Sequence, residues 1–169
     1  METLIESTAK FKLAGQVEEV KAVFEKELRA RLSLIKVASP LFVARNSGLN
    51  DDLNGIEKAV SFQLNNEEQQ IVHSLAKWKR WYLKELKAPI GKGIVTNMLA
   101  IRADEVLSPI HSHLVDQWDW EKPILKENRT LETLIDYGTD VFEALKTTEE
   151  YYARIEDVAT TLPKQLKVI

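Results

Sequence analysis

The spacing of apolar residues predicts three helices in this chain. Apolar side chains recur every three or four positions, with charged residues between them, over residues 16–31, 75–86 and 130–154. The second helix is expected to end ahead of Pro89, because the residue before a proline disfavours helical backbone. Gly138 lies inside the third helix at some local cost in stability. Each helix is amphipathic and is expected to bury one face.

Shorter segments between the helices have the composition of strands. Predicted strands cover 34–43, 59–64, 70–73 and 112–120, another is opened by Gly91 and Gly93 and ends at Ile101, and 162–169 resembles the start of one more. A turn is predicted at Asn65–Asn66. Pro40 has no N–H for a sheet ladder, so its strand is expected at an edge or an interface. The order of elements predicts a single α+β domain over residues 1–169 with an antiparallel or mixed sheet.

Composition narrows the class of protein without naming a function. The 169 residues can bury a sizeable core, and the absence of cysteine excludes a thiolate nucleophile and a cysteine-built zinc site. That absence also fits a cytoplasmic protein. No apolar run approaches the length of a membrane span, and the N-terminus lacks the features of a signal peptide. The net charge of −3 gives no overall attraction to nucleic acid.

Two carboxylates occupy a polar loop between Gly48 and Gly55. Asp51 and Asp52 could be aimed from this loop at a ligand, since loops on a rigid scaffold often carry binding residues. Aspartate is also common in turns, where its side chain bonds nearby backbone. From spacing alone, the turn is the favoured interpretation.

The helix over residues 75–86 mixes basic and aromatic side chains. They are Lys77, Trp78, Lys79, Arg80, Trp81, Tyr82 and Lys84. Such a mixture could bind phosphate or nucleic acid: the basic side chains would contact the phosphate groups, and the aromatic rings would stack on bases. It is equally typical of an ordinary amphipathic helix whose tryptophans face the core and whose basic stems cover apolar surface.

Arg102 follows a predicted strand and has carboxylates close behind it. A guanidinium in this position can bind a phosphate or a carboxylate through two parallel hydrogen bonds. A surface ion pair with Asp104 or Glu105 is the simpler interpretation of the same residues.

The last predicted strand carries polar groups on both faces. Alternation places Gln117 and Asp119 on one face and Asp116, Trp118 and Trp120 on the other. Covered polar groups need partners, so an amide and a carboxylate on one face favour a small-ligand pocket that accepts an ammonium group. His111 and His113 also share a strand face, but no third metal ligand lies nearby in the sequence, and we expect no metal site.

Two long runs in this chain resemble one family. The runs 73–80 (His-Ser-Leu-Ala-Lys-Trp-Lys-Arg) and 116–122 (Asp-Gln-Trp-Asp-Trp-Glu-Lys) are similar to those of ammonia-dependent asparagine synthetase, also called aspartate–ammonia ligase. Further similarities lie at 31–35, 38–40, 48–55, Ala100-Ile101-Arg102 and Asp104-Glu105. The likeness extends from the first long helix to the C-terminus.

The resemblance implies a fold and a reaction. The fold is that of class II aminoacyl-tRNA synthetase catalytic domains, an antiparallel-rich, mixed sheet flanked by helices. The reaction makes L-asparagine from L-aspartate and ammonia, with ATP cleaved to AMP and pyrophosphate through a β-aspartyl-adenylate. ATP and Mg²⁺ are therefore the expected cofactors, and cations can stabilise the charge that develops on phosphoryl oxygens.

The resemblance also implies roles for residues around the amino acid. Asp51 matches a catalytic aspartate near the reacting carboxyl, where it could hold ammonium or help to deprotonate it. Ser74 and Lys79 match groups around the substrate. Gln117 and Asp119 match residues that orient it, with Asp119 paired to its ammonium group.

Other matched residues concern the nucleotide and the assembly. Arg102 matches the arginine of the second class II motif, which grips the ATP α-phosphate, and Glu105 is assigned to ATP binding with it. The segment through Pro40 matches the first class II motif, which implies a homodimer. Membrane binding is not expected.

This chain departs from the family's pattern in two residues and in length. Asp52 stands where many relatives carry asparagine, and His113 stands where an apolar residue is usual. The family's full domain is about twice as long as this chain. That length still lies within the usual size of a single domain. The resemblance therefore implies that the chain is the N-terminal half of an aspartate–ammonia ligase domain. The alternative is a truncated, non-catalytic fragment that dimerises or needs a complementing C-terminal half.

Overall fold

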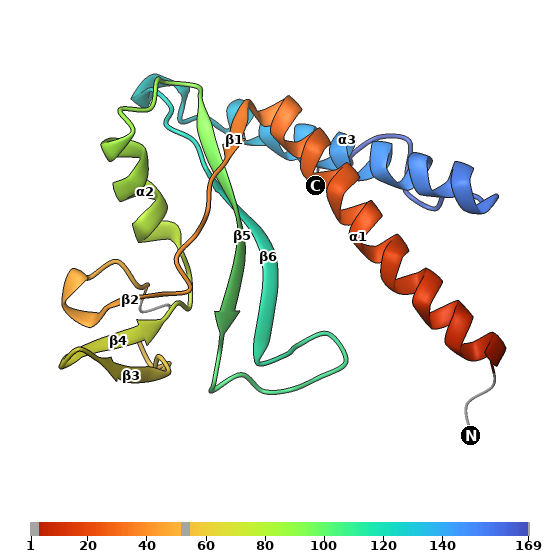
Figure 1. Cartoon of the computed structure of the whole chain (residues 1–169). Helices are drawn as coiled ribbons and strands as arrows, with labels where there is room; N and C mark the ends of the chain where they lie inside the picture. Colours follow the sequence, from red (N-terminus) through yellow and green to blue (C-terminus); the bar gives the residue numbers. More distant parts are fainter. Residues whose placement is uncertain (1–3, 52–54, 169) are drawn as a thin grey trace. The chain divides into compact units, whose positions relative to one another are not determined.

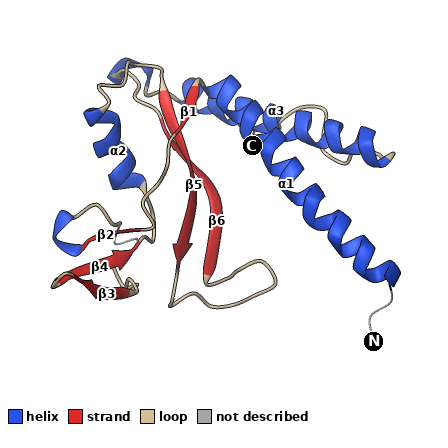
Figure 2. Ribbon diagram, in the orientation of Figure 1, coloured by secondary structure: helices blue, strands red, loops and turns tan. Residues whose placement is uncertain are grey.

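The computed structural model describes residues 4–51 and 55–168 (Figure 1). Helices and two small sheets make up the chain, which confirms the predicted α+β class (Figure 2). The chain divides into two compact units: one combines Met1–Ser33 with Leu125–Ile169, and the other comprises Leu34–Ile124. Both sheets belong to the second unit.

The first unit is a pair of antiparallel helices. Its elements are α1 (Leu4–Leu32), the short 3₁₀ helix η2 (Lys126–Asn128) and α3 (Leu131–Glu156). Toward the start of α1, Lys12 Nζ donates to the Glu156 carboxylate at 2.8 Å and Gln16 Nε2 donates to it at 2.5 Å. Toward its end, Arg31 donates to Thr147 Oγ1 at 3.2 Å. Residues 12–16 of α1 therefore lie against the end of α3.

The starts of the two long helices differ in how well the apolar periodicity predicted them. α3 begins next to Thr130, whose Oγ1 accepts a hydrogen bond from the Thr133 N–H at 3.2 Å and so caps the helix. α1 begins at Leu4, well before the predicted start at residue 16. The added turns include Phe11, whose side chain is largely exposed, so they have no buried stripe for a pattern to reveal. Cross-helix contacts of the kind made by Lys12 hold this segment instead.

The predicted strand at 162–169 is wrong for the residues that the structure describes. No strand occurs in 158–168, because side chains of α3 bind this segment's backbone. The Glu149 carboxylate accepts from the Thr161 N–H at 2.6 Å, the Thr161 hydroxyl at 2.7 Å and the Leu162 N–H at 3.0 Å. The Thr161 hydroxyl and these N–H groups lower the pKa of Glu149, because they favour its charged form.

The second unit carries two three-stranded sheets in its described part. Its elements are β1 (Leu34–Lys36), β2 (Phe42–Ala44), the 3₁₀ helix η1 (Arg45–Ser47), β3 (Ser61–Leu64), β4 (Glu67–Ile71), α2 (Ala76–Glu85), β5 (Gly93–Ile101) and β6 (Leu114–Glu121). The first sheet has the order β1-β5-β6, with β1 parallel and β6 antiparallel to β5. The second has the order β2-β4-β3 and is antiparallel throughout. The predicted mixed, antiparallel-rich pairing is thus confirmed.

Two local predictions for this unit have different outcomes. The turn at Asn65–Asn66 is confirmed: both residues have positive φ, 51° and 64°, as the tight connection of β3 to β4 requires. The single strand predicted over 34–43 is instead two short strands in different sheets, with Pro40 between them. Proline cannot donate to a ladder, so pairing stops there and resumes beyond it. Both β1 and β2 are edge strands, as Pro40 suggested.

The core of the second unit joins strands of both sheets to α2. Its buried cluster consists of Val43, Val72, Leu75, Trp78, Met98 and Ala100. Because these residues come from β2, the start of α2 and β5, the cluster fixes α2 against strands of both sheets. The polar side chains that α2 and β6 share are positioned by this packing.

Gly93 is where two neighbouring strands approach β5 most tightly. A Cβ atom at this residue would lie 2.5 Å from the Glu121 backbone oxygen and 2.6 Å from Leu34 Cδ2. We expect Gly93→Ala to lower the free energy of unfolding by about 2–3 kcal/mol, because overpacking displaces backbone as well as side chains. Urea unfolding would measure it, with Gly15→Ala as the control, since nothing lies within 4 Å of a Cβ there. A Gly93→Ala chain as stable as the parent would contradict this packing.

Candidate active site

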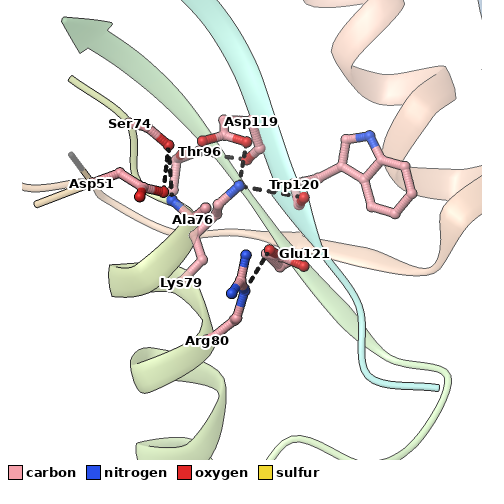
Figure 3. A network of polar contacts seen from close by, with 9 residues as sticks. All are labelled: Asp51, Ser74, Ala76, Lys79, Arg80, Thr96, Asp119, Trp120 and Glu121. Carbon is pink, nitrogen blue, oxygen red and sulfur yellow. Dashed lines mark hydrogen bonds and ion pairs between the residues drawn. The ribbon is translucent and has the colours of Figure 1, made fainter. Parts of the chain in front are cut away.

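A buried ion pair between α2 and β6 is the centre of the site. Lys79 is only 1% exposed, and its Nζ pairs with the Asp119 carboxylate (Figure 3). The same Nζ donates to the Trp120 backbone oxygen at 3.3 Å. Thr96 Oγ1 donates to the Asp119 backbone oxygen, also at 3.3 Å, and ties β5 to this point of β6. A lysine this deeply covered keeps its charge at low cost only when it has such partners.

The burial of Trp78 and Lys79 favours the amphipathic-helix interpretation of α2. Trp78 is buried in the core and its ring stacks on Tyr82 at 4.9 Å, so it does not present a face for bases. Trp81 remains exposed. The helix is therefore an amphipathic core helix in which one basic residue, Lys79, is buried with the apolar face. Arg80, the next residue, lies outside and pairs with Glu121 at 3.2 Å.

Asp51 reaches the start of α2 from its loop. Its Oδ2 accepts from the Ser74 hydroxyl at 3.4 Å (Figure 3). Its Oδ1 lies 3.9 Å from Lys77 Nζ. Ser74 Oγ in turn accepts from the Ala76 N–H at 3.2 Å, so one hydroxyl joins the helix start to the loop. These contacts are with another segment, which is not what the turn interpretation of Asp51 predicts. Asp52 lies outside the described residues.

Asn50 is a site residue that the sequence did not single out. It is buried, and its Oδ1 accepts from the His73 N–H at 2.9 Å while its Nδ2 donates to the Ile71 oxygen at 3.2 Å. These bonds hold the loop against the end of β4, immediately ahead of Ser74. The only signal in the sequence was the run of polar residues around Asn50, and such runs are ordinary in loops.

Gln117 and Asp119 lie on one face of β6, as alternation predicted. Gln117 is opposite Met98 and Asp119 is opposite Thr96, and both β5 partners are fully buried. Side chains of directly opposed residues point to the same side of a sheet. Gln117 and Asp119 therefore lie on the same face of the sheet as Met98, which packs in the core. The Trp120 ring projects away from the Lys79 network, as expected for the next residue along (Figure 3).

Arg102 does not form the predicted surface ion pair with residues that the structure describes. Asp104 instead accepts from the Lys58 N–H at 2.9 Å, and Glu105 donates its own N–H to the Arg102 oxygen at 3.2 Å. Arg102 Nε is covered and has no hydrogen-bond partner within the described chain. A covered guanidinium N–H without a partner costs free energy, which an anion could offset.

The two histidines that share a strand face bind their own neighbourhood. His111 Nδ1 is 2.7 Å from Ser108 Oγ, and His113 Nδ1 is 3.1 Å from the Arg102 oxygen. Across residues 4–51 and 55–168, no cluster of three or more histidine and acidic side chains is close enough to hold a metal ion.

The site thus combines a buried ammonium–carboxylate pair with an adjacent hydroxyl and carboxylate. The family model described as aspartate–ammonia ligase matches residues 12–169. The chain belongs to the aspartate–ammonia ligase family. It is 47% identical over 157 residues to an aspartate–ammonia ligase of Clostridium perfringens, and 45% identical over 156 residues to one of Bacillus cytotoxicus. The resemblance seen in the two long runs is therefore confirmed.

The alignment with these relatives is unequal in length. It includes 90% of this chain in both cases, but only 47% of the Clostridium perfringens ligase and 48% of the Bacillus cytotoxicus ligase. The chain therefore spans about half the length of the curated relatives it matches.

Solved structures confirm the fold that the family implied. A pyrrolysyl-tRNA synthetase of Desulfitobacterium hafniense superposes with a TM-score of 0.55 at 17% identity, over 77% of this chain and 45% of that one. An asparaginyl-tRNA synthetase of Entamoeba histolytica, solved with asparaginyl-adenylate, gives 0.59 at 13% identity, over 96% of this chain and 36% of that one. At these identities the likeness concerns the class II synthetase fold alone.

In the described residues, none of the helices has the length and apolar character needed to cross a bilayer.

Proposed function

We propose that residues 1–169 are the N-terminal half of an aspartate–ammonia ligase domain and contribute the aspartate-binding part of its active site. The observation that carries this is the buried Lys79–Asp119 pair, with the Ser74–Asp51 contact at the start of the same helix. A buried ion pair is a poor source of stability compared with apolar packing. Because this chain belongs to a family of ligases, we favour a role for the pair in binding a charged substrate.

The proposed reaction has two steps, which the family relationship supports. An oxygen of the aspartate β-carboxylate attacks the α-phosphorus of ATP and displaces pyrophosphate, which gives β-aspartyl-adenylate. Ammonia then attacks the β-carbonyl carbon and displaces AMP, and the nitrogen loses one proton as L-asparagine forms. A nearby carboxylate can hold the nitrogen or accept that proton, which is the role proposed for Asp51.

The other residues near the Lys79–Asp119 pair would bind and orient L-aspartate. Lys79 and Ser74 would bind aspartate carboxylate oxygens, Asp119 its α-ammonium group, and Gln117 would orient the reacting group. A cationic side chain next to the phosphoryl group lowers the cost of the charge that develops there.

The nucleotide would be held outside this group of residues. The covered N–H of Arg102 fits a phosphate oxygen, and Glu105, three residues later in the chain, is assigned to the same ligand. Magnesium, which usually binds through substrate phosphates and few carboxylates, would neutralise phosphoryl charge when bound with ATP. The absence of cysteine is consistent with the proposed cytoplasmic location.

The second candidate is a non-catalytic fragment that dimerises or complements a separate C-terminal half. Two observations favour it: the chain spans about half of its relatives, and β6 is the outer strand of its sheet in the described chain. An outer strand is where a strand from another chain can add. The proposed homodimer through the Pro40 segment is a different arrangement. Size-exclusion chromatography with light scattering would show a dimer for the dimerising fragment and for the Pro40 homodimer. A stable monomer would contradict both dimers and leave complementation by a C-terminal half.

Calorimetric titration of the folded chain with L-aspartate and with ATP–magnesium tests the proposed site. We expect saturable aspartate binding that Asp119→Asn weakens by roughly 10-fold or more, since it removes a charged hydrogen-bond acceptor. The matched control is Asp116→Asn, which makes the same change three residues away on the other face of β6. Equal losses in the two variants would contradict the assignment of Asp119. A folded chain that binds neither ligand would favour the non-catalytic fragment.

A further inference from the structure

A small pocket lies between the end of α2 and the end of β6. Its volume is about 330 Å³, which is in the range of small-ligand pockets. Its wall consists of Arg80, Leu83, Lys84, Lys87, Ala88, Glu121, Lys122 and Pro123. All of these residues belong to the second unit. None of them belongs to the proposed aspartate site or to the proposed ATP site.

The wall of this pocket is basic, although the chain as a whole has a net charge of −3. Among its described residues, Arg80, Lys84, Lys87 and Lys122 are cationic, and Glu121 is acidic. The Glu121 carboxylate accepts from Arg80 Nε at 3.2 Å, so its charge offsets that of one cation (Figure 3). The wall therefore keeps an excess of positive charge.

Lys84 and Lys87 have no carboxylate partner in the described chain. Both residues are exposed, and within that part of the chain neither side chain forms an ion pair or a hydrogen bond. Their backbone is fixed: the Lys87 N–H donates to the Lys84 oxygen and the Ala88 N–H to the Leu83 oxygen, each at 3.0 Å. The two ammonium groups are thus held next to the pocket on an ordered segment and can donate to a ligand.

The dipole of α2 does not account for this group of cations. Positive side chains are stable near the carboxyl end of a helix, which would explain Lys84 or Lys87 alone. Lys122, however, follows the end of β6, and Arg80 lies in the middle of α2. Like charges that face one small space repel each other, and a bound anion would offset this repulsion.

The size of the pocket and its donors indicate the class of anion. A lysine ammonium is a compact charge with three N–H donors, which suits phosphate oxygens. In about 330 Å³, several charges have to be balanced by one compact ligand. A single carboxylate offers two oxygens and one charge. A diphosphate group offers more of both in little volume, so it matches this wall better.

We propose that this pocket binds the diphosphate group of a small ligand, with Lys84 and Lys87 as its principal donors. This binding does not depend on the proposed ligase function, because the pocket shares no residue with the aspartate or ATP site. Its Arg80 and Glu121 follow Lys79 and Asp119 closely along α2 and β6. A ligand bound here therefore contacts the same two elements that carry the proposed substrate pair.

Backbone NMR of the whole chain, labelled with ¹⁵N, tests the pocket with pyrophosphate as the probe. Sodium pyrophosphate is titrated without magnesium at constant pH and ionic strength, and sodium sulfate is the matched salt. We expect the amide signals of 84–88 and 121–122 to shift saturably with pyrophosphate and hardly with sulfate. Equal shifts with both salts would overturn the proposal. Shifts confined to 102–105 would place the ion at the proposed ATP site and would also overturn it.

Variants separate the pocket from a general effect of charge. Lys84→Gln and Lys87→Gln are each expected to weaken pyrophosphate binding roughly 5-fold, because each removes one charged donor at a site that solvent reaches. Lys58→Gln makes the same change at an exposed lysine of the same unit outside this pocket, and it should leave the affinity unchanged. Arg102→Met should leave it unchanged as well. Equal weakening by Lys58→Gln and Lys84→Gln would contradict a specific site.

Two further ligands distinguish the possible sources of the phosphate groups. ADP that shifts the same signals, and is weakened by the same variants, would support the pocket and assign its diphosphate to a nucleotide. A single-stranded RNA oligonucleotide provides the contrast, because α2 also exposes Trp81, on which a base could stack. RNA that binds more tightly than pyrophosphate and also shifts the Trp81 ring signal would overturn the diphosphate pocket in favour of a nucleic-acid surface.

Discussion

Lys79→Met is expected to lower the free energy of unfolding by about 3 kcal/mol, because it leaves Asp119 partly buried without its charged partner. Methionine keeps most of the lysine volume, so the loss reports the charge and not a cavity. Lys79 is 1% exposed and the Asp119 side chain 21%, so solvent reaches only one of the two groups appreciably. The measurement is urea unfolding followed by circular dichroism. The same variant should lose aspartate binding in calorimetry, if Lys79 contacts the substrate as proposed.

The neighbouring helix position provides the matched control. Arg80 also pairs with a carboxylate of β6, Glu121, but the Arg80 side chain is 67% exposed. Arg80→Met should therefore change the free energy of unfolding by less than about 1 kcal/mol, since exposed pairs are weak. If the two variants are equally stable, Lys79 is not held as the structure describes. A difference that disappears at high salt would mean that solvent reaches the Lys79–Asp119 pair.

Arg102→Met is expected to weaken the binding of ATP–magnesium by about 100-fold with little change in stability, because a charged hydrogen bond to phosphate is lost. The free energy of unfolding is expected to change little for the same reason that Arg102 is proposed to bind phosphate. The Arg102 Nε has no hydrogen-bond partner in the described residues, so the variant removes no Nε hydrogen bond to that part of the chain. Calorimetry with ATP–magnesium measures the first effect and thermal unfolding the second.

A second arginine distinguishes a phosphate site from a general loss of positive charge. Arg129 is exposed and lies in the helical unit, outside the unit that carries Arg102. Arg129→Met should leave nucleotide binding unchanged. Nucleotide binding that falls equally in both variants would reject a specific phosphate contact. A large loss of stability in Arg102→Met would point to a structural role for the guanidinium instead.

Local sequence predicted those parts of the fold that are set by nearby residues. The apolar periodicity of α3 is local, and so is the pair of asparagines that turns β3 into β4. The first helix was predicted too short because its early turns carry exposed side chains such as Phe11 and so show no apolar stripe. The contact of Lys12 with Glu156 comes from far along the chain. The chain's end was predicted as a strand because its composition suits one, whereas Glu149 binds its backbone.

In the candidate site, too, the sequence predicted what nearby residues set and missed what distant segments set. Strand alternation correctly placed Gln117 and Asp119 on one face, since that depends only on the two-residue repeat. Basic and aromatic residues on α2 could not reveal that Lys79 is buried, because burial depends on β6, some 40 residues later.

The sequence by itself determined the family, through two runs of residues, and the order and type of the main elements, through periodicity. Only the tertiary structure decided which polar groups lose their water. Desolvation is set by atoms that distant segments bring together, and a linear pattern does not contain those distances. That is why Lys79 is found paired inside the protein and Arg102 has a covered N–H without a partner in the described chain.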